Sequence, residues 1–173
     1  MPDSITVRRA VAADADSIAQ VQVETWKAAY RGTVPDTFLD DMDLGERAER
    51  WRQGFGDRPE RRTTWVAEEG GEIRGFVAFG PCRDDDASAA VGELDAIYVI
   101  PDRWRRAIGT ALHDVCLAEL RGRGFNEATL WMLDANPGAK AFYERLGWVA
   151  DGATAPHDFA GTDLALVRYR RTL

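Results

Sequence analysis

ELDAIYVIPDRWRRAIGTAL, residues 93–112, joins an apolar strand to a helix through a short basic turn. The strand extends back to Val91 and ends before Pro101. Apolar residues then recur from Ile108 at steps of three and four, which predicts a helix over Ala107–Leu120. This strand, turn and helix form the most informative unit of the chain.

The basic turn of this unit has the features of an anion site. The first amides of a helix have no intrahelical acceptor and lie at the positive end of the helix dipole, so they can bind a group such as a pyrophosphate. Arg103, Arg105 and Arg106 add positive charge to an otherwise acidic protein. The small residues Ala107 and Gly109 let a ligand approach the backbone. An ordinary strand-to-helix connection with solvated arginines would contain the same residues.

Hydrophobic periodicity extends the prediction towards both ends of the chain. Before the unit we expect a strand at Ile5–Val7, a helix from an Asp14 N-cap to Gly32, a helix over Leu44–Phe55, and a hairpin of Thr63–Glu68 and Ile73–Phe79 closed by Gly70 and Gly71. After it we expect a strand at Ala128–Leu133, a helix from an Asn136 N-cap to Gly147, and strands at Trp148–Asp151 and Asp163–Tyr169. This order mixes hairpins with crossovers and predicts an α/β fold, a mixed sheet with helices on both faces.

The composition argues against several classes of partner. The 173 residues include 22 Lys and Arg against 29 Asp and Glu, a net charge of -7 that disfavours nucleic acid. No apolar stretch is long enough to cross a bilayer, so we expect a soluble, cytoplasmic protein without membrane contact. Cys82 and Cys116 stand alone, and we expect neither a disulfide nor a metal site. His113 and His157 have no partners at ligand spacing and are expected in structural or solvated positions.

Two motifs resemble those of a known family. Arg105-Arg106-Ala107-Ile108-Gly109-Thr110 is similar to the loop with which the GNAT superfamily of N-acetyltransferases binds the pyrophosphate of acetyl-CoA, Q/R-x-x-G-x-G/A. Asn136-x-x-Ala139-x-x-Phe142-Tyr143-Glu144-x-Leu146-Gly147-Trp148 resembles the later motif of that family, N-x-x-A-x-x-F-Y-x-x-x-G-F. The resemblance implies a single N-acetyltransferase domain over residues 1–173, with acetyl-CoA as co-substrate. It also implies the GNAT fold, with a mostly antiparallel central sheet of about six to seven strands.

The loop departs from the family pattern at two positions. Trp104 stands at the initial Q/R position and Ala107 at the first Gly position. Most residues offer the same backbone N–H, and Ala is acceptable where φ is negative, so we expect the anion site to keep its amides. The missing polar side chain removes any contact that it would make with the co-substrate.

The resemblance further implies which residues bind acetyl-CoA. They are the loop residues Arg105, Arg106, Ala107, Ile108, Gly109 and Thr110, together with Asn136 and Tyr143. Backbone groups of Ile97 and Val99 are expected to pair with the pantetheine arm and the acetyl carbonyl, as an added strand would.

Acyl transfer to an amine needs a base for the amine and a proton for the departing thiolate. By resemblance, Tyr143 matches the family's tyrosine near the thioester sulfur and is the expected acid, with a core aromatic as the alternative. Glu93 lies at the separation from the loop at which some members place a general base. Asp95 points to the same face if the strand is regular, whereas a bulge would change that. Two solvated carboxylates on an exposed strand are the alternative.

The acceptor side of the site has fewer candidates. The helix stripe that should face the core is formed by Ile18, Val21, Thr25 and Ala28. Trp26 and Tyr30 fall off this stripe and share one helix face. Proteins of the resembled family commonly line the acceptor site with the first helix, which makes both residues, with Asp95, candidates for substrate binding. Packing against the second helix through Trp51 or Phe55 is the alternative.

The sequence therefore predicts an acetyl-CoA-dependent N-acetyltransferase that moves the acetyl group to a primary amine of a small molecule by direct attack. The alternatives are a CoA-sensing domain of the same fold and a protein N-terminal or lysine acetyltransferase. An open groove would suit a peptide, and a closed aromatic pocket a small molecule. A homodimer is expected only because such assemblies are common.

Overall fold

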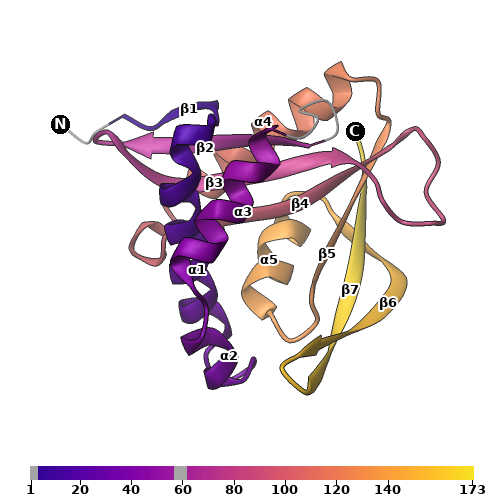
Figure 1. Ribbon diagram of the computed structural model, residues 1–173. Helices are drawn as coiled ribbons and strands as arrows, with labels where there is room; N and C mark the ends of the chain where they lie inside the picture. Colours follow the sequence, from indigo (N-terminus) through magenta and orange to yellow (C-terminus); the bar gives the residue numbers. More distant parts are fainter. Residues whose placement is uncertain (1–3, 57–61) are drawn as a thin grey trace.

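The computed structural model describes residues 4–56 and 62–173 of the chain (Figure 1). The elements are, in order, β1 (Thr6–Arg9), α1 (Ala15–Tyr30), α2 (Asp36–Asp40), α3 (Leu44–Gly56), β2 (Thr63–Glu69), β3 (Glu72–Pro81), β4 (Val91–Val99), α4 (Ile108–Gly122), β5 (Glu127–Leu133), α5 (Pro137–Arg145), β6 (Val149–Phe159) and β7 (Thr162–Thr172). Short 3-10 turns at Ala12–Asp14 and Pro101–Arg103 precede α1 and α4. In this described part, no helix combines the length and the apolar character needed to cross a membrane.

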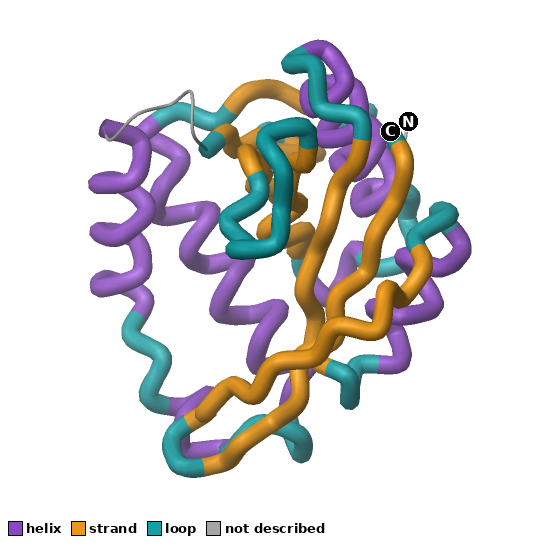
Figure 2. The backbone as a smooth tube through the Cα atoms, turned by 90° about the vertical axis from the view of Figure 1, so that its right-hand side faces the viewer, coloured by secondary structure: helices purple, strands orange, loops and turns teal. Residues whose placement is uncertain are grey.

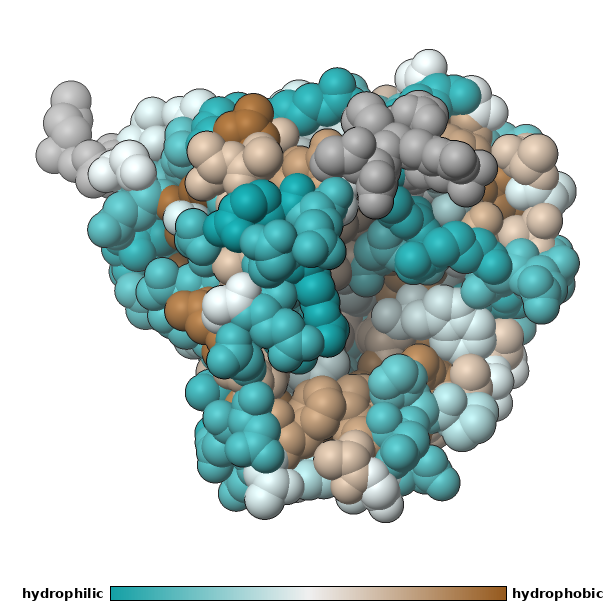
Figure 3. Space-filling view, in the orientation of Figure 1, coloured by the Kyte–Doolittle hydropathy of each residue, from teal (hydrophilic) through white to brown (hydrophobic). Residues whose placement is uncertain are grey.

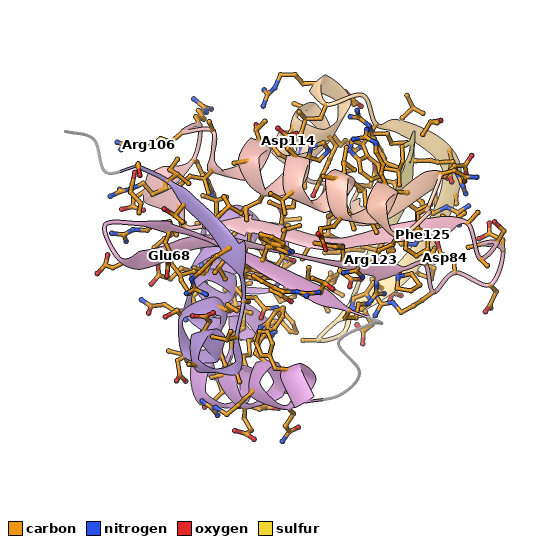
Figure 4. The ribbon with its side chains drawn as sticks, turned by 90° about the horizontal axis from the view of Figure 1, so that it is seen from above. Glu68, Asp84, Arg106, Asp114, Arg123 and Phe125 are labelled. Atoms are coloured by element: carbon orange, nitrogen blue, oxygen red, sulfur yellow. The ribbon has the colours of Figure 1, made fainter. Side chains whose placement is uncertain are left out.

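The strands form one seven-stranded sheet in the order β1-β2-β3-β4-β5-β7-β6. Neighbouring strands are antiparallel except β4 and β5, which run parallel because α4 carries the chain back between them. Helices α1 and α3 cover one face of the sheet, while α4 and α5 cover the other (Figure 2 and Figure 4). The expected mixed, mostly antiparallel sheet with helices on both faces is confirmed.

Strands β4 and β5 pair only at their first residues and then separate. The pairing joins Val91–Glu93 to Glu127–Thr129, although β4 continues to Val99 and β5 to Leu133. On their other sides β4 stays paired with β3, and β5 with β7. The second half of β4 therefore has a strand neighbour on one side only. We call this feature the β4–β5 divergence.

Strand β4 contains one residue more than the stretch of β3 opposite it. Ala78 pairs with Ala96, and the next residue, Phe79, pairs with Leu94. Asp95 is therefore the extra residue of a β-bulge.

The bulge shifts the alternation of side chains along β4. Leu94 and Val99 both enter the apolar core beneath α4, where they meet Ile108. In a regular strand they would point to opposite faces, because they are an odd number of positions apart. Ala96 and Tyr98 pack in the opposite core, beneath α1 and α3. The bulge thus lets both ends of β4 contribute to the core beneath α4.

Two expectations for the first helix need correction. Asp14 is the N-cap residue of α1, as expected, but its carboxylate accepts hydrogen bonds from Arg8 Nη1 and from the Val11 amide, both at 2.8 Å, and makes no capping hydrogen bond to α1. Ala28 is exposed, although the rest of the predicted stripe is buried. The last turns of α1 instead bury Val23 and Tyr30 in a separate cluster near α2, because this part of the helix extends past the sheet face.

Two further elements differ in extent from the prediction. Helix α2 lies between the first two predicted helices, where we expected no element, and it buries Leu39. Strand β6 is longer than expected because Gly152, with φ 89°, sits at a register shift and lets pairing with β7 continue beyond it. The remaining elements overlap the ranges that periodicity predicts.

The close approach of β3 and β4 generates a stability prediction. Gly75 lies opposite Val99, and a Cβ there would lie 2.9 Å from the carbonyl oxygen of Tyr98. We expect Gly75→Ala to lower the free energy of unfolding by about 1–3 kcal/mol, the cost of overpacking against backbone. Gly54→Ala in α3 is the control, because nothing lies within 4 Å of its Cβ and alanine is the better helix former. Urea denaturation in which Gly75→Ala is as stable as the wild type would contradict this packing.

Candidate active site

The turn before α4 contains two residues other than glycine in the left-handed region. Arg105 and Ala107 both have φ 64°, and Ala107 is the N-cap of α4. Residues of this conformation in a turn direct successive backbone N–H groups into a concavity that can hold an anion. The expectation of a negative φ at Ala107 is wrong. The family pattern has glycine at this position because glycine alone adopts the conformation without steric cost.

The first turn of α4 presents amides that have no acceptor within the helix. The Ala111 amide donates to the Ala107 carbonyl at 2.9 Å, so the amides of Ile108, Gly109 and Thr110 precede the first helical bond. No side chain of the described residues caps this end. Arg106 is exposed beside it at the N-terminal end of α4 (Figure 4), and no described carboxylate forms an ion pair with it. The turn therefore combines free donors with positive charge.

The packing of α5 against α4 explains why position 109 is a glycine. A Cβ at this position would lie 3.3 Å from the Phe142 ring. The glycine therefore makes room for α5 against α4. Its role in the approach of a ligand stays a prediction. Its amide still belongs to the free first turn.

Two side chains hold the end of β4 at the β4–β5 divergence. The Val99 carbonyl accepts hydrogen bonds from Thr25 Oγ1 at 3.1 Å and from Trp104 Nε1 at 2.6 Å. Trp104, which occupies the Q/R position of the family pattern, thus binds the strand. Neither contact has a signal in the sequence, since each joins a side chain to a backbone atom.

The backbone of β4 offers further groups at the divergence. The Ile100 amide donates to the Arg74 carbonyl at 2.9 Å, so Ile100 directs its polar groups to β3. Groups along an antiparallel strand alternate in direction. Ile97 and Val99 therefore direct their amides and carbonyls to the open edge, on the side where an added chain could pair with them.

Tyr143 lies on α5 and is almost fully buried. Its ring contacts those of Phe142 and Trp148 at centroid distances of 5.1 and 6.0 Å. Burial raises the pKa of its hydroxyl, and the nearby Tyr98 and Tyr30 add to the effect. No described side chain bonds to this hydroxyl. The Tyr143 ring thus packs in the core, and its hydroxyl lies close to residues from the opposite face of the sheet. Its role as acid stays a prediction.

Asn136 joins the two helical layers at the divergence. Its Oδ1 accepts a hydrogen bond from the Ala139 amide at 3.0 Å and caps α5, as expected. Its Nδ2 donates to the Tyr30 hydroxyl at 3.5 Å. The beginning of α5 is therefore tied to the end of α1.

Trp26 and Tyr30 pack together in an apolar cluster below this contact. Their ring centroids are 4.7 Å apart, and Trp26 also contacts Phe38 of α2 and Phe159 of β6. The alternative of packing against Trp51 is wrong, because that residue belongs to another cluster beneath α3. Acceptor contacts of Trp26 and Tyr30 stay a prediction.

Glu93 and Asp95 point to the same side of β4 and share two arginines. The Arg83 amide and Nε donate to Glu93 at 3.1 and 3.2 Å, and Arg62 Nη2 donates to it at 3.0 Å. Arg62 Nε lies 3.0 Å from Asp95, which also pairs with Arg83. Asp95 is the bulged residue, and the two carboxylates still share Arg62 and Arg83, so the bulge does not separate them. Glu93 is only 6% exposed, so the alternative of solvated carboxylates is wrong for it.

The two carboxyl groups differ in proton affinity. Burial acts to raise the pKa of Glu93, but the hydrogen bonds and charges of Arg83 and Arg62 outweigh it and hold that pKa below its usual value. For Asp95, burial outweighs the charge of Arg62 and, with the neighbouring Glu93 charge, raises the pKa to about 6. Asp95 is therefore the carboxylate better suited to exchange a proton near neutral pH.

A cavity of about 670 Å³ adjoins this pair on the α3 side of the sheet. Asp95, Ala96 and Tyr98 of β4 form one wall, and Arg47 and Trp51 of α3 form another. Polar residues border the recess beside α3 (Figure 3). The turn before α4 and this cavity thus lie on opposite faces of the sheet.

Sequence reasoning missed several residues of this region. Arg62 and Arg83 bind the carboxylate pair, and Arg47 lines the cavity. They lie far from the recognised motifs, in or beside segments of mixed charge, where an arginine is most simply explained as solvated. His113 is buried and accepts a hydrogen bond from Trp148 Nε1 at 3.0 Å, which is a structural role. Among the described residues, no three His, Cys, Asp or Glu side chains gather as metal ligands.

Comparison with known proteins gives consistent matches. Residues 22–148 match the model of a family described as Acetyltransferase (GNAT) family. The chain is 31% identical over 133 residues to Uncharacterized N-acetyltransferase YuaI of Bacillus subtilis, spanning 77% of this chain and 74% of that protein. It is 28% identical over 173 residues to Probable N-acetyltransferase Rv2775 of Mycobacterium tuberculosis, spanning 98% and 94%.

Solved structures share the architecture. The PaiA N-acetyltransferase of Thermoplasma acidophilum, in complex with coenzyme A, superposes with a TM-score of 0.77 over 98% of this chain and 99% of that chain. The sequence identity is 19%, so this similarity is one of fold.

The strained N-cap generates a prediction for stability. Alanine in the left-handed region costs roughly 1–2 kcal/mol, and Ala107 has φ 64°. We expect Ala107→Gly to raise the free energy of unfolding by about 1 kcal/mol after the greater freedom of unfolded glycine is allowed for. Ala111→Gly, one turn later inside α4, should lower it by about the same amount. If denaturant unfolding finds both variants destabilised, the N-cap is not strained.

Proposed function

Because the chain belongs to the GNAT family of acetyltransferases, we propose that it moves the acetyl group of acetyl-CoA to a primary amine of a small molecule. One observation carries this proposal. The anion-binding turn and the carboxylate pair lie on opposite faces of the sheet, and both adjoin the β4–β5 divergence. A donor and an acceptor that enter from opposite faces can meet at that point.

The groups on the α4 side fit acetyl-CoA. The amides of residues 108–110 and the exposed Arg105 and Arg106 are suited to a pyrophosphate. The open edge at Ile97 and Val99 is suited to a pantetheine arm, whose amides can pair with it as an added strand. One of these groups is already engaged, since the Val99 carbonyl binds Thr25 and Trp104. We therefore assign the pairing to the Val99 amide and to Ile97.

When bound, acetyl-CoA supplies a thioester whose acyl carbon the amine attacks directly. Tyr143 is the proposed acid for the departing thiolate. Its raised pKa keeps its proton in place at neutral pH, and no described side chain competes for that proton. Asn136 supports this role, because it fixes the beginning of α5 against Tyr30.

The Glu93 and Asp95 pair is the proposed base. Glu93 was the expected acceptor of the amine proton, but Arg62 and Arg83, which also pair with Asp95, hold the pKa of Glu93 below its usual value. Asp95 lines the cavity and has a pKa of about 6. We assign proton acceptance to Asp95, directly or through a water, and assign to Glu93 the positioning of the arginines that flank Asp95.

The size of the acceptor side favours a small molecule. A cavity of about 670 Å³ lies within the range of about 300–1,000 Å³ typical of small-molecule sites. Its lining comes from α3, β2, β3 and β4, and it is partly open to solvent. The volume is the property that favours a small molecule over a protein N-terminus or lysine.

Tyr143→Phe tests the acid. The change keeps the ring among Phe142 and Trp148 and removes only the proton, so we expect turnover to fall roughly 10²-fold with acetyl-CoA affinity little changed. Phe142→Leu serves as the control for packing without loss of a proton. Normal turnover by Tyr143→Phe with an authentic acceptor would make water or another group the acid.

Asp95→Asn and Glu93→Gln separate the two carboxylates. A base must be ionised, so wild-type turnover should be lost as pH falls through about 6, the pKa of Asp95. We expect Asp95→Asn to lower the maximal turnover by roughly 10²-fold and to remove the acid limb, the fall in turnover below about pH 6, from the pH–rate profile. Glu93→Gln should keep the limb and move it to lower pH, because the negative charge that raises the pKa of Asp95 is gone. If Glu93→Gln removes the limb and Asp95→Asn does not, Glu93 is the base.

The reaction itself is tested by acetyl-CoA-dependent thiol release against amines, amino acids, aminoglycosides and peptides. We expect at least one small amine to release CoA thiol above the hydrolysis background. Tight acetyl-CoA binding without release of CoA thiol in the presence of any acceptor would contradict acetyl transfer and favour a CoA-sensing domain. Release with peptides alone would identify a protein acetyltransferase.

A further inference from the structure

The cavity on the α3 side has a mostly basic lining. Among the described residues that line it, the charged ones are Arg9, Arg47, Arg50, Arg62, Arg83 and Asp95. The chain as a whole carries a net charge of -7, so this basic lining is a local arrangement and not a consequence of composition. A recess lined by one sign of charge concentrates ligands of the opposite sign.

Two arginines of this cavity, Arg9 and Arg47, have no ion pair with a described carboxylate. Arg9 is exposed and donates to Thr63 Oγ1 at 3.5 Å, so Arg47 is the partly buried arginine without a matching charge. Arg62 and Arg83 are paired with Glu93 and Asp95, and Arg50 is paired with Glu46. No carboxylate in the described ranges forms an ion pair with Arg47. It is partly buried all the same.

The packing of α3 holds Arg47 over β4. Trp51 lies one turn later on α3, contacts the Phe76 ring at 5.1 Å and donates a hydrogen bond to Gln22 of α1 at 2.9 Å. Phe76 in turn contacts Tyr98 at 5.5 Å. These contacts fix the face of α3 that carries Arg47 towards the same wall that carries Asp95.

A partly buried guanidinium without a counter-charge is unfavourable. Burial and the nearby charge of Arg50 lower the pKa of Arg47, which reports the same imbalance. An anionic ligand would relieve it. The planar donors of arginine match a carboxylate in a bidentate arrangement.

We infer that the acceptor is an amine that also carries a carboxylate, an amino acid, whose carboxylate binds Arg47 while its amine lies towards Asp95. This inference rests on the proposed acetyl transfer. The cavity carries both an unmatched cation and the proposed base, so a molecule with a carboxylate and an amine complements both. A purely cationic amine would be repelled by the arginines, because it has no negative group to pair with them.

Matched substrates test the carboxylate. Each amino acid is compared with its own carboxamide, which keeps the side chain and the amine and removes only the negative charge. We expect kcat/KM for the best amino acid to exceed that of its amide at least tenfold. Calorimetric titration of the coenzyme-free protein with the same two compounds gives a binding readout that is independent of turnover.

Variants of Arg47 test its role. We expect Arg47→Met to raise KM or Kd for the amino acid at least tenfold, to change the values for the amide less than twofold, and to leave kcat for the amino acid close to the wild type. Arg47→Lys should recover part of the loss because it keeps the charge. Arg52→Met is the control on α3, since Arg52 is exposed and paired with Asp16 and Glu49. The thermal midpoint of Arg47→Met should equal or exceed that of the wild type, because an unmatched buried charge is removed.

The outcomes separate this inference from the function on which it rests. If amides are acetylated as well as amino acids, or if Arg47→Met weakens both equally, the inference is overturned and acetyl transfer stands. If no amine is acetylated, acetyl transfer fails, and the calorimetric comparison of amino acid and amide still decides the role of Arg47. A marked loss of thermal stability in Arg47→Met would identify a structural residue and overturn the inference.

Discussion

The parallel pairing of β4 with β5 lasts from Val91 to Glu93, and the open edge of β4 beyond it is the constraint on which the site depends. A sheet edge inside a fold must have its polar backbone groups satisfied. Here Thr25 and Trp104 bind the last carbonyl of the strand, and the Asn136–Tyr30 contact joins the helical layers across the divergence. The remaining edge groups are directed to where a substrate with amides of its own can pair with them. The fold thus leaves available backbone N–H and C=O groups that would be paired with the next strand in an uninterrupted sheet.

Electrostatics complements this geometry. The chain is acidic overall, yet both the turn before α4 and the cavity beneath α3 have several arginines and few acidic residues. At the first place the charges supplement helix amides. At the second, two arginines hold Glu93 and leave Asp95 with the higher pKa. Two carboxylates two positions apart are therefore chemically different, because their neighbours and their burial differ.

Much of the fold follows from local sequence signals. The glycine pair at residues 70 and 71, the Asn136 N-cap and the apolar strand before Pro101 each have a direct physical meaning, and the corresponding elements lie where they predict. The two motifs that resemble the GNAT family identified it correctly. Long-range features were harder to predict. The Asp95 bulge depends on how β4 meets β3, and no residue near it is a bulge signal.

The candidate site was predictable in part. Glu93 and Tyr143 came from resemblance to the family and Asp95 from its place two residues after Glu93, and the structure brings the two carboxylates together. Their arginine partners lie 31 and 10 residues from Glu93, in segments with no pattern of their own. The positive φ of Ala107 could not be predicted for a different reason. Alanine has no preference for the left-handed conformation, which tertiary context imposes on it here.

The bulge in β4 has one further consequence. Leu94 and Ala96 occupy consecutive positions opposite β3, as though Asp95 had been inserted between them. Removing that single residue would restore regular alternation and leave the facing of every neighbouring side chain unchanged. The fold of β4 and the carboxylate that we propose as proton acceptor are therefore separable. Insertion or deletion of one codon could add or remove this carboxylate while the sheet and both cores stay intact.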